Sequence, residues 1–362
     1  MTLQRRVLLA AGGTGGHLFP AEALANALVA RGIAVDLVSD DRAAVYADSF
    51  PAKLHQISSG TVTGSGIFGK IRGIMHLMSG TRQALSLISR LRPAAVVGFG
   101  GYPTVPPVYA ATIRRIPTII HEANAVMGRA NRFLGPRVSR IATGFPLKDQ
   151  KWASKTVVTG NPVRQPVLEA AMVPYPPLRP GDAMNLLVFG GSQGARVMGE
   201  IVPGAIGRLS TEQRARLLVT QQARDDDASR VREAYAALGV RAVVEPFFRD
   251  LPMRIATAHL VVSRSGASTC AELAVIGRPS ILVPLPGSID QDQAANAQIL
   301  KDAGAATVQP QTGFTEEWLT GELARYLENP ESLAESAMKA RSVAVSDAAD
   351  RLADLVIATA GL

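Results

Sequence analysis

The stretch GGTGGHLFP, residues 12–20, decides the fold of the first half of the chain. It places four glycines within five residues, directly after an apolar run at 7–11 and before a helical pattern at 21–31. Its proline suits the first turn of that helix. A second apolar run at 33–38 predicts the next strand. The order strand, glycine turn, helix, strand is typical of a parallel, doubly wound α/β sheet.

The same pattern begins again after the proline- and glycine-rich segments GNPVRQP and PYPPLRPG, which indicate a hinge. A strand is predicted at 185–189, a glycine turn at 190–194 and a helix at 195–209. Further strands are predicted at 94–98, 118–121, 138–142, 217–220, 242–245, 260–263 and 280–283, and further helices at 270–276 and 334–360. The length of 362 residues also favours two domains. We predict two Rossmann-like domains facing a cleft, at 1–162 and 163–339, with a C-terminal helix at 340–362 packing back on the first.

Charge is distributed unevenly between these halves. Residues 1–162 hold 19 Lys/Arg and 7 Asp/Glu, a formal charge of +12, whereas the remainder carries −4. A basic half suggests an anionic partner such as a phosphate or a membrane surface. Aromatic residues form only 5% of the chain, so we expect no nucleic acid partner. One cysteine, Cys270, favours a reducing compartment, and we expect a cytoplasmic protein without a membrane-spanning segment.

Glycine turns at the ends of parallel strands let backbone N–H groups approach a phosphate. A nicotinamide enzyme would need G-x-G-x-x-G and an acidic residue about twenty residues on. Leu18 stands where the third glycine should be, and Asp36 falls inside the predicted strand rather than at its end, so this alternative has partial support. No Lys-Ser/Thr pair follows either turn, as a P-loop requires. Two phosphate turns suit a nucleotide-sugar donor in one domain and an acceptor in the other.

Several residues of the second domain suit such a donor. Ser192 and Gln193 lie on the second glycine turn. Glu272 can accept hydrogen bonds from the vicinal hydroxyls of a ribose, or can complement the charge of its helix terminus. Asp292, Gln293 and Asn296 suit sugar hydroxyls, or cap a helix. Arg164 lies in the hinge, where it suits a diphosphate as well as an ordinary surface position.

In the first domain His17 follows the glycine turn, and Glu122 and Asn124 follow a strand. A near-neutral pKa suits a histidine for proton transfer, so His17 is our candidate general base and Glu122 the reserve.

The segment 67–82 mixes apolar residues with cations and holds no acid. We predict that this segment contacts an anionic membrane surface, although a buried helix with solvated cations would give the same pattern.

Seven motifs occur in order along about 300 residues: GGTGGHLFPA, GFGGYPTVPP, HEANAVMGRAN, GNPVR, GGSQGA, SRSGAST-x-x-EL and DQ-x-x-NA. Together they closely resemble the bacterial peptidoglycan N-acetylglucosaminyltransferases that form lipid II. The resemblance implies a GT-B fold, UDP-N-acetylglucosamine as donor and undecaprenyl-diphosphoryl-N-acetylmuramoyl-pentapeptide as acceptor. It also implies a peripheral position at the cytoplasmic face of the inner membrane.

The resemblance assigns roles to matching positions. Thr14, Gly15, Gly16 and Asn124 would line the acceptor side, and Arg164 and Ser192 would bind the donor diphosphate. Phe248 would lie beside uracil, Ala267, Ser268 and Thr269 would hold the nucleotide with Glu272 on the ribose, and Gln293 would bind the sugar. Ala123 and Asp292 depart from the Gln and His frequent in the family.

The donor carries an α-linked sugar and the family's product linkage is β, so the resemblance implies a single inverting displacement, in which the acceptor C4 hydroxyl attacks as UDP leaves. Backbone amides of the second glycine turn, their helix dipole and Arg164 can stabilise the leaving diphosphate, so we expect no metal and no cofactor. A nicotinamide oxidoreductase and a non-catalytic nucleotide-sugar binding module are the alternatives from other functional classes.

Overall fold

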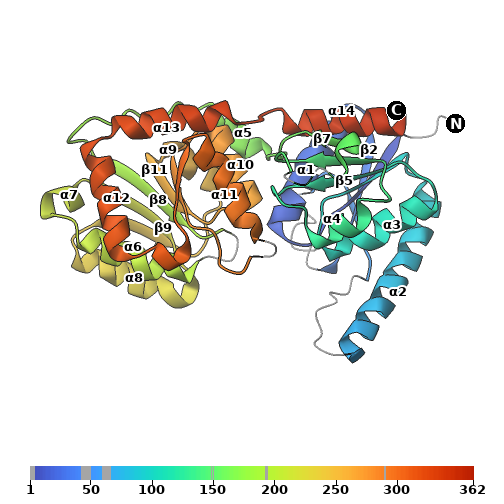
Figure 1. Ribbon diagram of the computed structural model, residues 1–362, viewed down its shortest axis with the longest axis horizontal. Helices are drawn as coiled ribbons and strands as arrows, with labels where there is room; N and C mark the ends of the chain where they lie inside the picture. Colours follow the sequence, from blue (N-terminus) through green and yellow to red (C-terminus); the bar gives the residue numbers. More distant parts are fainter. Residues whose placement is uncertain are drawn as a thin grey trace. The chain divides into compact units, whose positions relative to one another are not determined.

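The computed structural model describes residues 5–41, 50–58, 67–147, 149, 151–191, 195–288 and 291–362, with only the backbone of 67–74. The chain forms two compact units (Figure 1). Unit 1 comprises Met1–Arg164 and Ser346–Leu362, and unit 2 comprises Gln165–Val345. Each unit is a parallel sheet with helices on both faces, which confirms the predicted doubly wound α/β class.

Unit 1 has a seven-stranded sheet among its described residues, in the order β3-β2-β1-β4-β5-β6-β7. Its strands are β1 Arg6–Ala10, β2 Ala34–Ser39, β3 Lys53–Gln56, β4 Ala95–Gly98, β5 Thr118–Glu122, β6 Arg140–Thr143 and β7 Thr156–Val158. Its helices are α1 Gly15–Val29, α2 Ile67–Leu91, η2 Tyr102–Thr104, α3 Val105–Ile113, α4 Arg129–Leu134, η3 Ala153–Lys155 and α14 Ala348–Ala360. One face of the sheet packs on α1 and α14, and the other packs on α2 and α3.

Unit 2 has a six-stranded sheet among its described residues, in the order β10-β9-β8-β11-β12-β13. Its strands are β8 Met184–Phe189, β9 Leu217–Gln222, β10 Arg241–Glu245, β11 Leu260–Ser263, β12 Ser280–Leu282 and β13 Ala306–Val308. Its helices are α5 Gln165–Ala171, α6 Arg196–Gly207, α7 Thr211–Ala215, α8 Asp225–Ala237, α9 Leu251–Thr257, α10 Ala267–Ile276, α11 Asp292–Asp302, η5 Gln311–Gly313, α12 Glu316–Glu328 and α13 Glu331–Ser342. The largest core of unit 2 lies between the sheet and α6, α8 and α12.

The C-terminal region differs from the single helix predicted at 334–360. It forms two helices, because α13 ends at Ser342 and α14 begins at Ala348. Helix α13 belongs to unit 2, and the chain returns to unit 1 at Ser346 rather than at residue 340. Helix α14 lies along α1 (Figure 1), with Leu352 and Val356 fully buried.

Both sheets have a topological switch point, where successive crossovers leave in opposite directions along the sheet. It lies between β1 and β4 in unit 1 and between β8 and β11 in unit 2. Ligands of open α/β sheets bind outside the carboxyl ends of the strands at this point. The two glycine turns follow β1 and β8, so the fold brings each of them to a switch point.

Candidate functional site

The switch point of unit 1 surrounds the ring of His17 with glycines. A Cβ atom built on Gly12 would lie 3.3 Å from Nδ1 of His17, one on Gly100 would lie 3.4 Å from Cδ2, and one on Gly101 would lie 3.4 Å from Cε1. Gly100 and Gly101 also have φ values of 85° and 75°, in the left-handed region that favours glycine. The glycines after β1 and β4 therefore make room for the imidazole between two strand ends.

The first glycine turn is shorter than predicted, because α1 begins at Gly15 and not at residue 21. Gly15, Gly16 and His17 form its first turn, with the backbone of Thr14 as N-cap. Pro20 therefore lies inside the helix. Oγ1 of Thr14 lies 2.9 Å from Nδ1 of His17, and the hydroxyl accepts in this hydrogen bond when the ring proton is on Nδ1. In that tautomer Nε2 carries the lone pair that a general base needs.

Glu122 lies at the end of β5 and is 4% exposed. One carboxylate oxygen accepts hydrogen bonds from the backbone N–H and side-chain amide of Asn124, at 3.1 and 3.2 Å. The other accepts from the Gly128 N–H at 2.9 Å and the Asn131 amide at 2.8 Å. Burial raises the pKa of Glu122, and these four bonds oppose the rise. Such a carboxylate is suited to holding Asn124 and the following loop in place.

His121 lies beside this network and is 1% exposed. Its Nε2 lies 3.2 Å from the carbonyl oxygen of Gly160, to which it can donate. Burial lowers the pKa of His121 to about 4, so the ring is neutral at physiological pH. A neutral, enclosed imidazole with its donor engaged suits a structural role better than proton transfer.

Arg164, the last residue of unit 1 before the boundary, stacks on Phe19 of α1. Its guanidinium carbon lies 3.7 Å from the centroid of the Phe19 ring, in cation–π geometry. Its Nε atom is buried without a hydrogen-bond partner among the described residues. The cation is therefore held against the helix that carries the first glycine turn.

The second glycine turn follows β8 at the switch point of unit 2. Ser192 and Gln193, which we expect on this turn, lie outside the described residues. Gly191 is described and has a φ of 84°. Helix α6 begins at Arg196 directly after the turn.

Across the same switch point, α10 begins at Ala267, three residues before the predicted start. Ser268, Thr269 and Glu272 are partly exposed on its first two turns, and Ser268 and Glu272 lie one turn apart on the same face. Ala267 is 8% exposed and turns its side chain inward. The residues of this segment that we expect to bind the nucleotide therefore lie together at the N-terminal end of α10.

Hydrogen bonds join helix α11 to Ser265, which lies just before α10. The Ser265 hydroxyl donates to the carbonyl oxygen of Gln293 at 2.8 Å, and the Asn296 amide donates to the carbonyl oxygen of Ser265 at 3.2 Å. The side-chain oxygen of Gln293 accepts from the Leu285 N–H at 3.0 Å. Its amide nitrogen is the atom that Gln293 can offer a sugar hydroxyl. Asp292 is the first residue of α11, whose N-cap is Gln291, and its carboxylate accepts from the backbone N–H of Gln293 at 2.7 Å, so it does not form the cap considered for it.

The ring of Phe248, expected beside uracil, is 4% exposed. The guanidinium carbon of Arg254 lies 4.3 Å from its centroid. The neighbouring Phe247 is 63% exposed. The loop after β10 thus offers a base the exposed ring of Phe247 as well as its own backbone.

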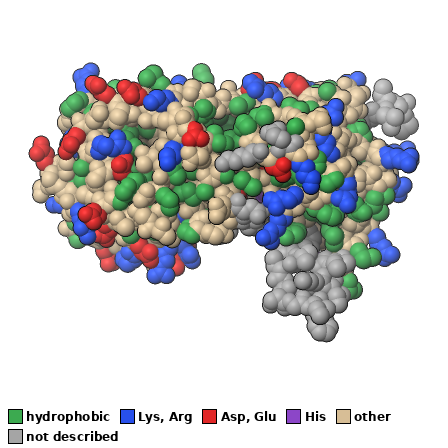
Figure 2. Space-filling view, in the orientation of Figure 1, with side chains coloured by type: hydrophobic (Ala, Val, Ile, Leu, Met, Phe, Trp, Pro, Cys, Tyr) green, Lys and Arg blue, Asp and Glu red, His purple; other side chains and the backbone are tan. Residues whose placement is uncertain are grey.

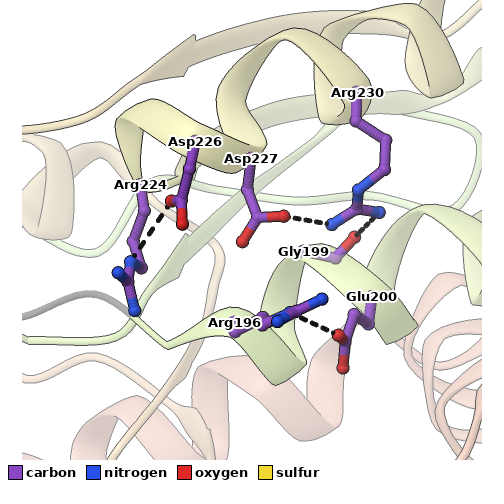
Figure 3. Close-up of polar contacts among 7 residues, drawn as sticks. All are labelled: Arg196, Gly199, Glu200, Arg224, Asp226, Asp227 and Arg230. Atoms are coloured by element: carbon purple, nitrogen blue, oxygen red, sulfur yellow. Dashed lines mark hydrogen bonds and ion pairs between the residues drawn. The ribbon is translucent and has the colours of Figure 1, made fainter.

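Helix N-termini at the two sheets differ in charge. Within the described part of the chain, the first turns of α1, α6 and α10 carry no acidic residue. Helix α8 instead begins with Asp225, Asp226 and Asp227, and of these Asp226 pairs with Arg224 and Asp227 pairs with Arg230 (Figure 3). The Arg230 side chain, bonded to Asp227 at 2.8 Å, lowers the pKa of that carboxyl. Carboxylates therefore complement the positive end of α8, whereas the described first turns of α1, α6 and α10 hold no carboxylate that could do so.

Asp36, the acidic residue of the nicotinamide alternative, is buried in the middle of β2. Its carboxylate contacts the guanidinium of Arg6 and lies 2.7 Å from Nε2 of His55. It is therefore engaged within the sheet, away from the strand end where a ribose would bind.

Two family models match the chain. The N-terminal domain of glycosyltransferase family 28 matches residues 7–143, and its C-terminal domain matches residues 185–352. A UDP-N-acetylglucosamine--N-acetylmuramyl-(pentapeptide) pyrophosphoryl-undecaprenol N-acetylglucosamine transferase of Mesorhizobium japonicum is 55% identical over 98% of this chain and 95% of its own. The chain belongs to glycosyltransferase family 28. A relative of the same name from Methylobacterium sp. is 56% identical over 99% of this chain and 97% of its own.

Solved structures agree with membership of family 28. The crystal structure of Acinetobacter baumannii MurG superposes with a TM-score of 0.79 at 30% identity, covering 97% of this chain and 99% of that one. A Neisseria meningitidis UDP-GlcNAc 2-epimerase has a TM-score of 0.69 at 13% identity, covering 98% of this chain and 100% of its own, which shows the shared fold alone. The expected GT-B fold is thereby confirmed.

Sequence analysis missed two polar residues that order the site of this family 28 chain. Asn131 donates to Glu122 and to the carbonyl oxygen of His121, and its amide would lie 3.6 Å from a Cβ on Gly100. Gln222, the last residue of β9, bonds to the loops on both sides. Asn131 belongs to the motif HEANAVMGRAN, but that motif does not indicate that its side chain bonds to Glu122. Gln222 continues a strand and is marked by no distinctive pattern in the sequence.

Proposed function

We propose that this chain transfers N-acetylglucosamine from UDP-N-acetylglucosamine to the C4 hydroxyl of the N-acetylmuramoyl unit of undecaprenyl-diphosphoryl-N-acetylmuramoyl-pentapeptide, forming lipid II in peptidoglycan synthesis. The observation that carries the proposal is the near full-length identity of 55% to transferases of that name. Its physical support is a pair of switch points, each bordered by helix N-termini with no acidic residue in their described first turns.

In the proposed reaction the acceptor C4 oxygen attacks the anomeric carbon as the bond to UDP breaks, which inverts the anomeric configuration. His17 takes the hydroxyl proton at Nε2, because Thr14 is placed to hold the other ring nitrogen. Because Glu122 accepts four hydrogen bonds, a positioning role suits it better than the role of reserve base. The residue that Glu122 positions is Asn124. Gly15 and Gly16 supply backbone N–H groups at the start of α1, where a diphosphate is attracted.

Unit 2 is the proposed donor domain. Ser268 and Thr269 offer hydroxyl and backbone donors at the start of α10, and Glu272 faces the ribose from the next turn. The second glycine turn, with Ser192 and Gln193, and the cation of Arg164 would stabilise the negative charge that grows on the leaving diphosphate. Gln293 offers its amide to the sugar, and the loop of Phe247 and Phe248 receives uracil.

We also propose that unit 1 contacts an anionic membrane at the cytoplasmic face. Met75 and Met78 of α2 are 65% and 60% exposed, and Phe133 of α4 is 44% exposed with Arg137 stacked on its ring at 4.7 Å. Among the charged side chains on the drawn face of unit 1, in the right half of Figure 2, Lys and Arg are more common than Asp and Glu. Apolar side chains among cations suit a bilayer interface. The side chains of 67–74 lie outside the described residues, and no described helix is long and apolar enough to cross a bilayer.

The stereochemistry of the product tests the proposed mechanism. Incubation with ¹³C-labelled donor and the lipid acceptor should give a β-linked disaccharide at C4, read from the anomeric coupling in NMR spectra. An acceptor with hydrogen in place of the C4 hydroxyl should give no product. An α-linked product, or transfer to the deoxy acceptor, would contradict a single displacement at that hydroxyl.

A further inference from the structure

Gln222 lies at the centre of the expected donor side of unit 2. It ends β9, whose neighbours are β8 on one side and β10 on the other. The loop after β8 begins at Gly190 and leads into the second glycine turn. The loop after β10 begins at Pro246 and carries Phe247 and Phe248. Donor diphosphate and uracil are expected at these two loops, so the strand between them is placed to set their separation.

The side-chain amide of Gln222 bonds to both loops. Its oxygen accepts from the Gly190 N–H at 3.2 Å, and its nitrogen donates to the carbonyl oxygen of Pro246 at 3.1 Å. A primary amide has the same donor and acceptor as a peptide group. It therefore continues the parallel ladder for one more rung beyond the last paired residues, Gln222 and Glu245. Gln222 is 8% exposed, so water competes weakly for these bonds.

We propose that Gln222 is a positioning residue for the donor, which fixes the distance between the diphosphate-binding and base-binding loops. This inference rests on the proposed function. A nucleoside diphosphate spans both loops, and its affinity therefore depends on their spacing. The acceptor is expected at unit 1, so a change at Gln222 raises the KM for the donor and leaves the KM for the acceptor unchanged.

Gln221 provides a matched control on the same strand. Its side chain points to the opposite face, where its oxygen accepts from the Tyr235 hydroxyl and its amide lies near Gly199 of α6. It is fully buried, and among the described residues its side chain bonds to Tyr235 and to neither donor loop. Gln221→Met should thus disturb β9 while leaving in place the hydrogen bonds of Gln222 to the two loops.

The experiment compares Gln222→Met, which loses both bonds, and Gln222→Glu, which keeps an acceptor for the Gly190 N–H, with Gln221→Met. We expect the KM for UDP-N-acetylglucosamine and the Kd for UDP to rise about tenfold in Gln222→Met, and to rise also in Gln222→Glu, whose carboxylate cannot donate to the Pro246 carbonyl oxygen. The acceptor KM should stay within twofold. Gln221→Met should lower the unfolding temperature and leave the donor KM within twofold. If Gln222→Met does not fold, the comparison of Gln222→Glu with Gln221→Met tests the proposal.

Unchanged donor KM and UDP affinity in both Gln222 variants, beside a wild type that binds UDP and transfers sugar, would overturn the assignment of Gln222 alone. A donor KM that rises equally in Gln221→Met would also overturn it, because any damage to the strand would then have the same effect. A wild type that does not bind UDP overturns the proposed function itself.

Discussion

At the scale of single residues, His17 is the group on which catalysis should depend most. His17→Ala removes the proposed base and should lower kcat by about 10²- to 10⁴-fold, the usual contribution of a positioned base. Thr14→Val, which removes the hydroxyl beside Nδ1, should lower kcat less. Steady-state kinetics with the lipid acceptor measure both. UDP affinity by calorimetry is the control and should change less than twofold. Near-normal turnover of His17→Ala would remove His17 from this role.

His121 should make the stability of unit 1 dependent on pH. Its pKa in the folded chain is about 4, below the ordinary value of 6.5, so the unfolded chain binds the proton more tightly. The resulting stabilisation is complete above pH 6.5 and is lost as pH falls toward 4, amounting to about 3 kcal/mol in the free energy of unfolding. Glu122, whose pKa burial raises, acts with the opposite sign above its ordinary pKa of 4.5.

The measurement is urea unfolding followed by the fluorescence of Trp152 in a Trp318→Phe background, since Trp152 lies in unit 1 and Trp318 in unit 2. His121→Asn serves as control, because it removes the titrating ring and leaves the Glu122 contribution in place. An equal pH dependence in both chains would contradict the assigned pKa.

At the scale of elements, α14 should be part of the core of unit 1 despite its distance along the chain. Leu352 is fully buried against the sheet side of α1, and Arg31 pairs with Asp350 and Asp354 on α14 at 2.9 and 3.3 Å. Leu352→Ala should lower the free energy of unfolding reported by Trp152 by about 2–5 kcal/mol. Leu333→Ala, an equally buried change on α13, should act on the Trp318 signal instead. The reverse assignment of signals would contradict the division at Ser346.

The central strands follow from apolar runs and glycine turns, which is why the doubly wound class was predictable, whereas the order of the strands in each sheet comes from the structure. Strands β3, β7 and β13 were missed because they have three or four residues and are only partly buried, so they leave no apolar run. The starts of α1 and α10 were placed too late because glycine and small polar residues at Gly15 and Ser268 resemble turn rather than helix. An alanine-rich composition joined α13 and α14 into one predicted helix.

A candidate site residue was predictable where it follows a glycine turn, as His17 does, whereas Thr14 was proposed from the family resemblance. It was not predictable where long-range hydrogen bonds give a residue its role. Glu122 looked like a possible base until its four N–H donors were placed, and Gln222 depends on loops that lie 24 and 32 residues away in the sequence. The spacing of residues along the sequence does not indicate which distant groups will become hydrogen-bond partners.

At the scale of the whole molecule, the two units should respond differently to the nucleotide. UDP contacts are proposed mainly in unit 2, so UDP at about 100 times its Kd should stabilise that unit by about 2.7 kcal/mol. Separate unfolding curves from Trp318 and Trp152, each in a background lacking the other tryptophan, measure the effect. A larger shift in the Trp152 curve would contradict the allocation of the donor to unit 2.

The most direct test of the central claim is UDP release by the purified chain, followed with and without undecaprenyl-diphosphoryl-N-acetylmuramoyl-pentapeptide. We predict that UDP-N-acetylglucosamine releases UDP only when this acceptor is present, in equal amount to the N-acetylglucosamine recovered in the lipid. Donor binding without any release on adding acceptor, or release at the same rate in its absence, would contradict a transferase that joins these two substrates.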